Sequence, residues 1–264
     1  MKIPFEQIDA FADRPFAGNP AAVMPLDAWP DDSLLQRIAA ENNLSETAYL
    51  VPDASGAADY ELRWFTPAVE VALCGHATLA SGHHVLSADP ARERVRFATR
   101  QAGVLEVARD GDGYAMALPA WTPAPRALPE VITALGVADV VDTLWHPRRY
   151  AVVVLKDEDS VRATAPDFRA LAAQGDLLTI VTAPGADTDI VSRAFAPGAG
   201  IDEDPVTGSA HAVIVPYWAA RLGRDRFSAF QASTRGGALA CRMAGDTVVL
   251  GGRCVTVIEG VFHA

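Results

Sequence analysis

Apolar and polar positions along this chain form many short segments with the pattern of strands, and only two long segments are apolar on nearly every side. Strict alternation of apolar and polar residues is the pattern of a half-buried strand, and a short apolar run is typical of a fully buried one. In the first half these patterns predict strands at residues 3–11, 21–25, 44–51, 60–65, 94–98, 104–109 and 114–118. In the second half they predict strands at 150–155, 177–182, 190–195, 227–232, 238–243, 247–250 and 253–259.

The two long apolar segments, 77–86 and 210–221, predict helices that are buried all round. Pro216 lies inside the second segment and predicts a kink there. A third helix is expected directly after Pro30–Ser33, because these residues include side chains that cap helix N-termini. Its apolar face is formed by Leu34, Leu35, Ile38 and Ala39, and short helices are expected at 130–135 and 167–173.

Both long apolar segments follow the same short phrase. Arg63-Trp-Phe65-Thr-Pro67 precedes the first, and Arg193-Ala-Phe195-Ala-Pro197 precedes the second. Phe195 lies 130 positions after Phe65, which is about half the length of the chain. A repeat of this period indicates a duplicated domain rather than a solenoid.

Few helices separate the predicted strands, which disfavours a parallel sheet made of alternating strands and helices. The pattern instead predicts an α+β fold with two pseudo-symmetric halves, each a small sheet around one buried helix. Four prolines within Leu118–Pro129 mark the expected boundary. The expected halves are 1–118 and 119–252, and a return of the last strand, within 253–264, to the first half stays open.

Charge and composition limit the class of protein. The 264 residues carry a formal net charge of −11 with scattered basic residues, so we expect no nucleic-acid partner. No apolar run approaches the ~20 residues of a membrane-spanning helix, and the N-terminus does not have the pattern of a signal peptide. The three cysteines show neither a disulfide framework nor metal-ligand spacing. We therefore expect a cytoplasmic protein without a metal site and without a membrane association.

Each predicted buried helix begins at a short glycine-containing turn, Leu73–Thr78 or Val206–His211. The first N–H groups of a helix have no partner within the helix and lie at the positive end of its dipole. Gly75 and Gly208 allow a ligand to approach the backbone closely, so both turns are candidates for binding a carboxylate. The alternative is that both are ordinary helix starts, and their repetition favours the binding role.

Polar side chains near these turns are candidates for acid–base chemistry. Glu46 precedes an apolar strand, where burial would suit a carboxylate to proton transfer near neutral pH; a plain edge or capping role is the alternative. His76 is either a proton carrier or a hydrogen-bonded core residue. Asp204 and Ser209 either hold a substrate or stabilise the start of the second helix. Cys74 is either activated by the helix end or an inert core thiol.

Six motifs resemble those of the phenazine-biosynthesis PhzF-like isomerase family. They occur in order, they cover nearly the whole chain, and they are specific only as a set. The motifs are Asp9-Ala-Phe-x-Asp-Arg-Pro-Phe-x-Gly-Asn-Pro-Ala-Ala-Val23, Glu41-Asn-Asn-Leu-Ser-Glu-Thr-Ala48, Arg63-Trp-Phe-Thr-Pro67, Cys74-Gly-His-Ala-Thr-Leu-Ala80, Asp202-Glu-Asp-Pro-Val-Thr-Gly-Ser-Ala-His211 and Gln231-Ala-Ser-x-Arg-Gly-Gly237.

The resemblance implies a diaminopimelate-epimerase-like fold, in which two duplicated domains each form a β-barrel-like sheet around a central helix. It also implies a homodimer and a cofactor-independent isomerase that acts on a small anionic substrate, with trans-2,3-dihydro-3-hydroxyanthranilate as the substrate of the best-known member. The resemblance assigns catalysis to Glu46, His76 and Asp204. It assigns substrate binding to Asn19, Gly75, Ala77, Gly208 and Ser209.

Two alternatives remain open beside this isomerase. Related epimerases and racemases use two facing thiols, and Cys74 resembles the first of them. The second glycine turn contains Asp204-Pro205-Val206 and no cysteine, which disfavours two-thiol chemistry and favours a proton shift by Glu46 alone. The other alternative is a protein that binds small acids without catalysis.

Overall fold

The alternating segments form strands in two separate units of the chain, for which a computed structural model describes residues 1–264. The first unit comprises residues 1–117 together with 251–264, and the second comprises residues 118–250. None of the helices combines the length and the apolar character that a membrane crossing requires.

Nine strands and two helices build the first unit. The strands are β1 (Lys2–Ala10), β2 (Asn19–Pro25), β3 (Glu46–Pro52), β4 (Tyr60–Phe65), β5 (Glu70–Val71), β6 (Arg94–Thr99), β7 (Val104–Asp110), β8 (Gly113–Pro119) and β18 (Cys254–His263). The helices are α1 (Asp32–Asn42) and α2 (Gly75–Ala88).

The second unit has nine strands and four α-helices. The strands are β9 (Ala124–Pro125), β10 (Val140–His146), β11 (Tyr150–Leu155), β12 (Leu178–Pro184), β13 (Ile190–Ala196), β14 (Ile201–Asp204), β15 (Arg226–Gln231), β16 (Gly237–Ala244) and β17 (Thr247–Gly252). The helices are α3 (Pro129–Leu135), α4 (Glu158–Ala163), α5 (Phe168–Ala172) and α6 (Gly208–Leu222).

The two units use the same order of strand pairings. In the first unit, β1-β2-β3-β4-β6-β7 pair in the sequence antiparallel, parallel, antiparallel, parallel, antiparallel. In the second unit, β10-β11-β12-β13-β15-β16 pair in the same sequence. A short extra strand joins β4 in one unit and β13 in the other, β5 and β14 respectively. The α+β fold with two pseudo-symmetric duplicated halves is therefore confirmed.

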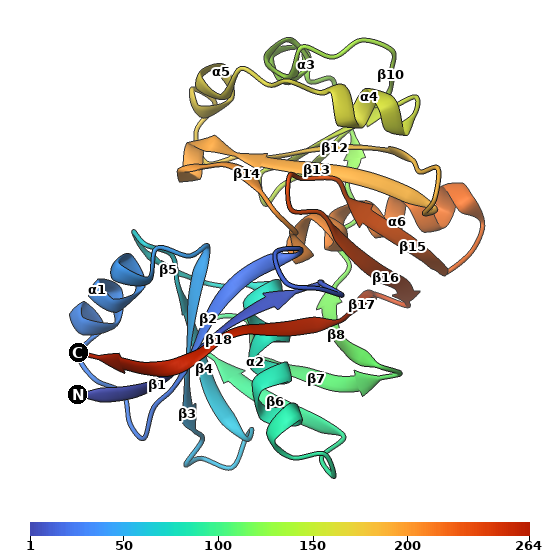
Figure 1. Ribbon diagram of the computed structural model, residues 1–264. Coiled ribbons are helices and arrows are strands. Elements are labelled where there is room, and N and C mark those ends of the chain that lie inside the picture. Colours follow the sequence, from blue (N-terminus) through green and yellow to red (C-terminus); the bar gives the residue numbers. More distant parts are fainter. The chain divides into compact units, whose positions relative to one another are not determined.

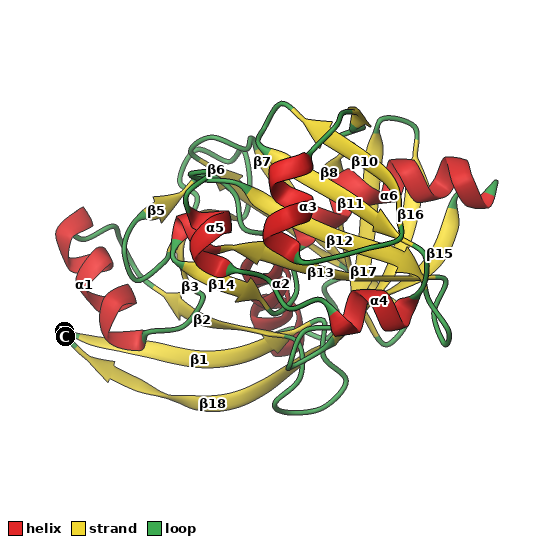
Figure 2. Cartoon of the chain, turned by 90° about the horizontal axis from the view of Figure 1, so that it is seen from above, coloured by secondary structure: helices red, strands yellow, loops and turns green.

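Helix α2 occupies the middle of the first unit, where β1, β2, β3, β6 and β7 all contact it (Figure 1). Its buried residues lie on all sides of the helix, from Gly75 to Leu86. The sequence predicted this burial because the segment has almost no charged residue. Strand β18 lies beside β1 along its whole length in the same unit, in antiparallel register from Lys2↔His263 to Ala10↔Cys254 (Figures 1 and 2).

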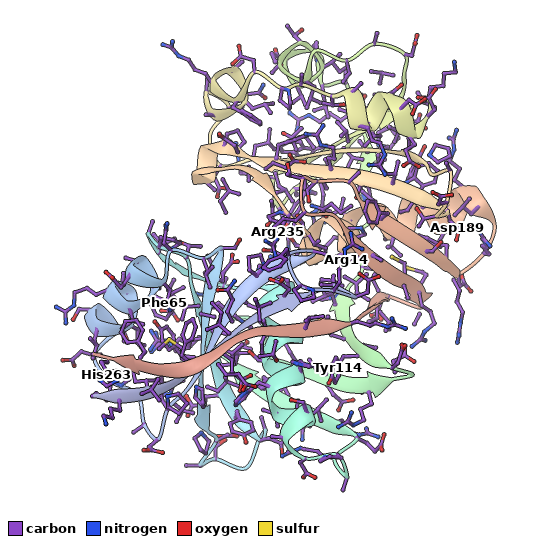
Figure 3. All side chains as sticks on the ribbon, in the orientation of Figure 1. Arg14, Phe65, Tyr114, Asp189, Arg235 and His263 are labelled. Atoms are coloured by element: carbon purple, nitrogen blue, oxygen red, sulfur yellow. The ribbon has the colours of Figure 1, made fainter.

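Helix α1 packs on β3 and β4 through Leu35, Ile38 and Ala39, which share a core cluster with Phe65 of β4 (Figure 3). The predicted N-terminal capping is wrong, because Asp31 makes no side-chain hydrogen bond at the cap. Helix α1 ends at Asn42, and Asn43 adopts the left-handed conformation with φ of 50°, which is common directly after a helix.

Pro216 lies inside α6 and removes the N–H that would otherwise donate to the carbonyl of Ala212. The N–H of Trp121 donates to this carbonyl instead, at 2.9 Å. A proline inside a helix thus creates an acceptor that binds the proline-rich segment after β8. The N–H of Ala120 also donates to the carbonyl of Asp246, so this segment is hydrogen-bonded into the second unit.

Candidate active site

Arg63 belongs to the Arg-x-Phe phrase that occurs in both halves, and its side chain binds the short strand β5 before the first glycine turn. Arg63 donates from Nε and NH2 to the two carboxylate oxygens of Glu70, at 2.8 Å each. Its NH1 donates to Asp32, also at 2.8 Å, and its guanidinium lies 5.0 Å from the centre of the Phe65 ring. Arg63 is only 3% exposed although it is charged, so the face of β4 that it shares with Phe65 is buried at this position. The buried charge is tolerated because it is fully paired.

The second half contains the same arrangement. Arg193 donates from Nε and NH2 to the carboxylate of Glu203, at 2.7 and 3.0 Å, and lies 5.0 Å from the centre of the Phe195 ring. Its NH1 also donates to the carbonyl of Thr164 at 2.6 Å. In each half the phrase Arg-x-Phe therefore places a stacked arginine that binds the short strand preceding the helix. Glu203, which lies in the Asp202–His211 motif, has this structural role.

Each glycine turn is closed by a side chain four residues after the residue that caps the helix. The hydroxyl of Thr78 donates to the carbonyl of Cys74 at 2.6 Å, and Nδ1 of His211 donates to the carbonyl of Thr207 at 2.8 Å. Cys74 and Thr207 are the N-caps of α2 and α6 and occupy equivalent positions. The second unit therefore has a hydroxyl residue where the first has a thiol.

The histidine that closes the second turn is neutral. Complete burial lowers the pKa of His211 to about 4, although its hydrogen bond to the carbonyl of Thr207 favours the charged form. Because Nδ1 donates, Nε2 carries the lone pair, and that atom is buried without a hydrogen-bond partner.

The first glycine turn brings four sequence-predicted or motif residues together. Glu46 begins β3, Asn19 begins β2, and Cys74 and His76 stand at the start of α2. His76 Nε2 lies 3.1 Å from Glu46 Oε2, Asn19 Nδ2 lies 3.1 Å from His76 Nδ1, and Cys74 Sγ lies 3.5 Å from the same Nδ1. The side chains of His76 and Glu46 are only 5% and 13% exposed. The structure thus forms one compact cluster of an acid, an imidazole, a thiol and an amide.

The contact between Glu46 and His76 is an ion pair rather than a directed hydrogen bond. Although Nε2 and Oε2 are 3.1 Å apart, neither atom is aligned with a hydrogen-bond partner. Buried polar atoms that lack a directed partner are uncommon in folded proteins, and a catalytic role is one of the physical reasons for which they are retained. This site therefore has hydrogen-bonding capacity that a substrate can use.

The electrostatics of the cluster favour a charged imidazole and a neutral thiol. Burial opposes the charged form of His76, but its contacts with the side chains of Cys74 and Glu46 outweigh burial and raise its pKa well above 6.5. Burial, reinforced by the charge of Glu46, raises the pKa of Cys74 to about 11. At neutral pH the thiol is therefore protonated, and Glu46 is the negative charge that faces the imidazolium.

A charged imidazole determines the orientation of the Asn19 amide. Both ring nitrogens of an imidazolium are donors, so Nδ1 of His76 needs an acceptor. A half-turn of the amide exchanges its nitrogen and oxygen without changing its shape. Asn19 therefore presents its oxygen to Nδ1 when His76 is charged, and its nitrogen when His76 is neutral.

Glu46, Cys74 and His76 also form a group whose ligand atoms lie within 4.8 Å of one another, the spacing of a potential metal site. The imidazole, however, faces Glu46 with Nε2 and Cys74 with Nδ1. One ion cannot use both of these short contacts, because each nitrogen lies on a different side of the ring. A protonated imidazole and a protonated thiol are also poor ligands.

In the second unit the turn before α6 is organised by a glutamine for which the sequence analysis assigned no role. Gln231 Oε1 accepts from the N–H of Thr207 at 2.9 Å, and its Nε2 donates to the carbonyl of Asp204 at 2.7 Å. The carboxylate of Asp204 accepts from the hydroxyl of Thr207 at 2.5 Å. Gln231 opens one of the six motifs, so the motif identified the residue but did not reveal its role.

The remaining predicted binding residues lie in the first turns of the two long helices. Gly75, His76 and Ala77 begin α2, and Gly208 and Ser209 begin α6. Ser209 is close enough to Tyr150, which begins β11, to lower the pKa that burial raises for this phenol. Tyr150 is not among the residues predicted from the sequence, because only the packing of β11 on α6 in the second unit brings it beside this helix.

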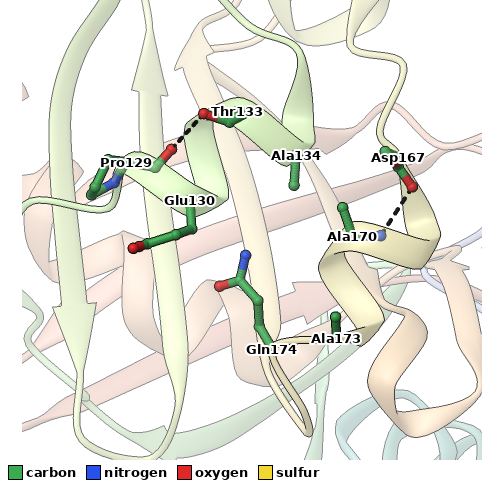
Figure 4. Close-up of a pocket in the computed structure, with 8 residues that line it drawn as sticks. All are labelled: Pro129, Glu130, Thr133, Ala134, Asp167, Ala170, Ala173 and Gln174. Carbon is green, nitrogen blue, oxygen red and sulfur yellow. Dashed lines mark hydrogen bonds between the residues drawn. The ribbon is translucent and has the colours of Figure 1, made fainter.

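A groove of about 500 Å³ lies elsewhere in the second unit, between α3 and α5 (Figure 4). Glu130 and Gln174 extend into it from the two sides, and Ala134 and Ala170 form part of its wall. Glu130 and Asp167 are its only ionisable lining residues, and neither belongs to the predicted site. The groove therefore does not replace the Glu46–His76 cluster as the candidate active site.

Comparison with known proteins identifies the same family as the motifs. A family model described as "Phenazine biosynthesis-like protein" matches residues 8–260. An uncharacterized isomerase of Pseudomonas aeruginosa is 49% identical over the full length of both chains. A solved phenazine biosynthesis protein of the PhzF family from Enterococcus faecalis is 43% identical, with a TM-score of 0.92 and complete coverage of both chains. A hydroxyproline epimerase from Agrobacterium vitis, 12% identical, shares only the fold, with a TM-score of 0.63 over 98% of this chain and 92% of its own.

Proposed function

The chain belongs to the phenazine biosynthesis-like PhzF family, and from this premise we propose that it is a cofactor-independent isomerase that moves a proton on a small carboxylated substrate. The prediction of an isomerase is confirmed at the level of the family, since its relatives include proteins named isomerases. The proposal concerns the substrate and the residues that act on it. The single observation that carries it is the buried contact between Glu46 and His76.

Glu46 is the proposed acid–base residue. A carboxylate that is 13% exposed and lacks a directed hydrogen bond has a lone pair available for a C–H proton of the substrate. Glu46 takes the proton from one carbon and returns it to another carbon of the same molecule, so no other group needs to change its protonation. The imidazolium of His76 orients the carboxylate and stabilises negative charge that develops on the substrate.

We further propose binding roles for the two glycine turns. Gly75 and Ala77 offer backbone N–H groups at the start of α2, and Gly208 and Ser209 offer them at the start of α6, where an anion is stabilised by the unpaired donors and the dipole. Asp204 is suited to an amino group of the substrate. An amino-bearing, dihydro-hydroxyanthranilate-like acid has both of the groups that these residues would recognise.

Epimerisation through Cys74 is disfavoured by the same geometry. The raised pKa of this thiol, about 11, means that little thiolate exists at neutral pH. The equivalent cap of α6 is Thr207, whose hydroxyl already donates to Asp204. A pair of thiol acid–base groups, as two-thiol chemistry requires, is therefore not available from these two positions.

Deuterium exchange tests the role of Glu46. In D₂O, the wild-type protein should incorporate deuterium at carbon into a substrate found by screening small amino-bearing acids, and Glu46→Gln should lose this exchange while it keeps its fold. Glu6→Gln is the matched control, because Glu6 also contacts a histidine, His84, at 2.9 Å in the same unit. Exchange that persists in Glu46→Gln would remove Glu46 from the mechanism. Binding of acids with no exchange in the wild-type protein would favour a binding protein without catalysis.

A further inference from the structure

Asp204 ends β14, and two residues outside that strand, Thr207 and Gln231, bind it. Its Oδ2 atom accepts from the hydroxyl of Thr207 at 2.5 Å, the length of a short hydrogen bond to a charged oxygen. The same hydroxyl lies 3.1 Å from Nε2 of Gln231, the last residue of β15. Gln231 is fully buried, and Thr207 is 7% exposed. The three side chains therefore form one connected network of hydrogen bonds before α6.

The backbone fixes the direction of each bond in this network. Gln231 Oε1 faces the N–H of Thr207 at 2.9 Å, and its Nε2 faces the carbonyl of Asp204 at 2.7 Å. A backbone N–H only donates and a carbonyl only accepts, so the reversed amide would lose both bonds. Nε2 therefore also donates to the Thr207 hydroxyl, whose single proton goes to the carboxylate of Asp204. This hydroxyl cannot reorient without breaking a bond, so it holds the carboxylate in one orientation.

The first unit builds the equivalent helix start without such a carboxylate. Asp204 is the last residue of the short strand β14 and lies three positions before Thr207, the cap of α6. The equivalent residue of the first unit is Val71, the last residue of β5, three positions before Cys74, the cap of α2. Val71 has no polar atom in its side chain. The fold therefore does not need a carboxylate at this position to begin the long helix.

The first unit also builds this helix start without an equivalent of the Gln231 amide. Gln231 and Thr99 each end a six-residue strand, and they pair with Ser192 and Leu62, the third residues of β13 and β4. The hydroxyl of Thr99 donates to the carbonyl of Gly103 at 2.8 Å, within its own turn. The bonds of Gln231 are therefore an addition of the second unit, and the side chain that they fix through the Thr hydroxyl is a carboxylate.

We propose that Gln231 and Thr207 are positioning residues that hold the carboxylate of Asp204 in the orientation that binds the amino group of the substrate. The assignment rests on the proposed function for the role of Asp204. A carboxylate that is already oriented loses little freedom when the ligand binds, which raises the affinity for a ligand with amino N–H groups. The two residues therefore select amino-bearing acids over acids without an amino group.

Two ligands that differ only in the amino group test this assignment. Anthranilate has an amino group beside its carboxylate, and benzoate is the same acid without it. The dissociation constant of each is measured by titration calorimetry with the full-length protein. Thr207→Val removes the hydroxyl and keeps the branched shape, and it should weaken anthranilate binding by about five- to tenfold, the effect of one lost hydrogen bond. It should change benzoate binding by less than about twofold.

Thr207→Ser retains the hydroxyl and should bind both ligands within about twofold of the wild-type protein. Thr164→Val is the matched control, because Thr164 is 6% exposed and its hydroxyl donates to the carbonyl of Ser160 at 2.9 Å, at the end of α4. It should leave both dissociation constants unchanged. Gln231→Leu should reproduce the selective loss, and adding it to Thr207→Val should cause less than about a twofold further loss. If Gln231→Leu folds poorly, the comparison of Thr207→Val with Thr207→Ser decides the question.

Several outcomes would overturn the assignment. An equal loss for both ligands in Thr207→Val would mean that the network only supports the turn. No loss for either ligand, the same loss in Thr207→Ser as in Thr207→Val, or independent effects of Thr207→Val and Gln231→Leu would also refute it.

Asp204→Ala separates this assignment from the proposed function. It should remove the preference for anthranilate over benzoate, and Thr207→Val should then cause no further selective loss. A wild-type preference that survives in Asp204→Ala would refute the proposed binding role of Asp204 and the assignment with it. A preference that is lost in Asp204→Ala but complete in Thr207→Val would refute the positioning role alone. Deuterium exchange that persists in Glu46→Gln, together with a selective loss in Thr207→Val, would refute the role of Glu46 and support that of Thr207.

Discussion

Replacement of Arg63 by methionine should destabilise the first unit strongly, because it removes a buried charge and leaves its partners behind. Arg63 is 3% exposed and makes two charge-assisted hydrogen bonds to Glu70 and one to Asp32, each of 2.8 Å. Breaking a buried ion pair by removing one partner costs about 3–5 kcal/mol. Glu70 is 28% exposed and regains some hydration, which lowers the expected cost to about 2–4 kcal/mol. Methionine retains much of the contact with Phe65, so the loss reports mainly on the ion pair.

Thermal and urea unfolding of the full-length protein measure this loss. For a domain of this size, each kcal/mol corresponds to about 3–4 °C in the melting temperature, so we expect a decrease of about 6–16 °C. The decrease should be confined to the transition of the first unit if the two units unfold separately. Arg193→Met provides the counterpart in the second unit, because its pairing with Glu203 has the same geometry.

Arg94→Met is the control for the loss of an arginine as such. Arg94 is 67% exposed and lies 3.7 Å from a carboxylate oxygen of Glu106, an arrangement that contributes about 0–1 kcal/mol. If Arg63→Met melted within about 2 °C of Arg94→Met, the idea that the repeated arginine holds the strand before the glycine turn would be refuted. The phrase Arg-x-Phe would then need another explanation.

Three further predictions concern the cluster around His76 and the loop that leads to it. The pKa of His76 is raised on folding, so the stabilisation that its charged form provides is present in full below about pH 6.5 and is lost as the pH rises through the raised pKa. The free energy of unfolding, measured in urea, should therefore fall as the pH rises through this range. His76→Gln should make the free energy of unfolding depend less on pH. Cys74→Ala should change the deuterium-exchange rate by less than about tenfold, because the protonated thiol is not the acid–base group. Loss of an essential nucleophile or base lowers a rate ~10³-fold or more, and a decrease of that size would support catalysis by the thiol of Cys74. Gly18→Ala should cost about 2–4 kcal/mol in urea unfolding, because φ is +64° and the new Cβ would lie 2.1 Å from the carbonyl oxygen of Ala10. Gly56→Ala, with φ of +76° and open space around it, should cost only about 1 kcal/mol, and equal costs would contradict the steric argument.

The local pattern of the sequence predicted most of the strands and both long helices. Tyr60–Phe65 and Tyr150–Leu155 match β4 and β11 to the residue, and the charge-free segment after Gly75 is the buried helix α2. Strands β10 and β14 and helix α4 were not predicted, because Asp142, Asp202 and Glu158 interrupt the apolar pattern by which elements are recognised. The resemblance to the PhzF-like family, drawn from six motifs, is confirmed.

The candidate site was predicted in part. The motifs include Glu46, His76 and Asn19, and the fold brings these three side chains within contact distance. The assignment of catalysis and substrate binding to particular residues stays a prediction. The role of Arg63 could not be read from β4, because alternation describes only which face a residue occupies and not whether a charge on the inner face finds a partner.

The sequence by itself determined the identity of the elements and the duplication, because strand and helix periods and repeated motifs are local properties of a chain. Only the tertiary structure decided which distant side chains meet. Glu46 and His76 are 30 positions apart, and Asn19 and His76 are 57 positions apart. Their contacts depend on how β2 and β3 pack on α2 within the first unit. Protonation follows from that packing as well, since the pKa values of His76 and Cys74 are set by burial, by the contact between these two side chains and by the carboxylate of Glu46 beside them.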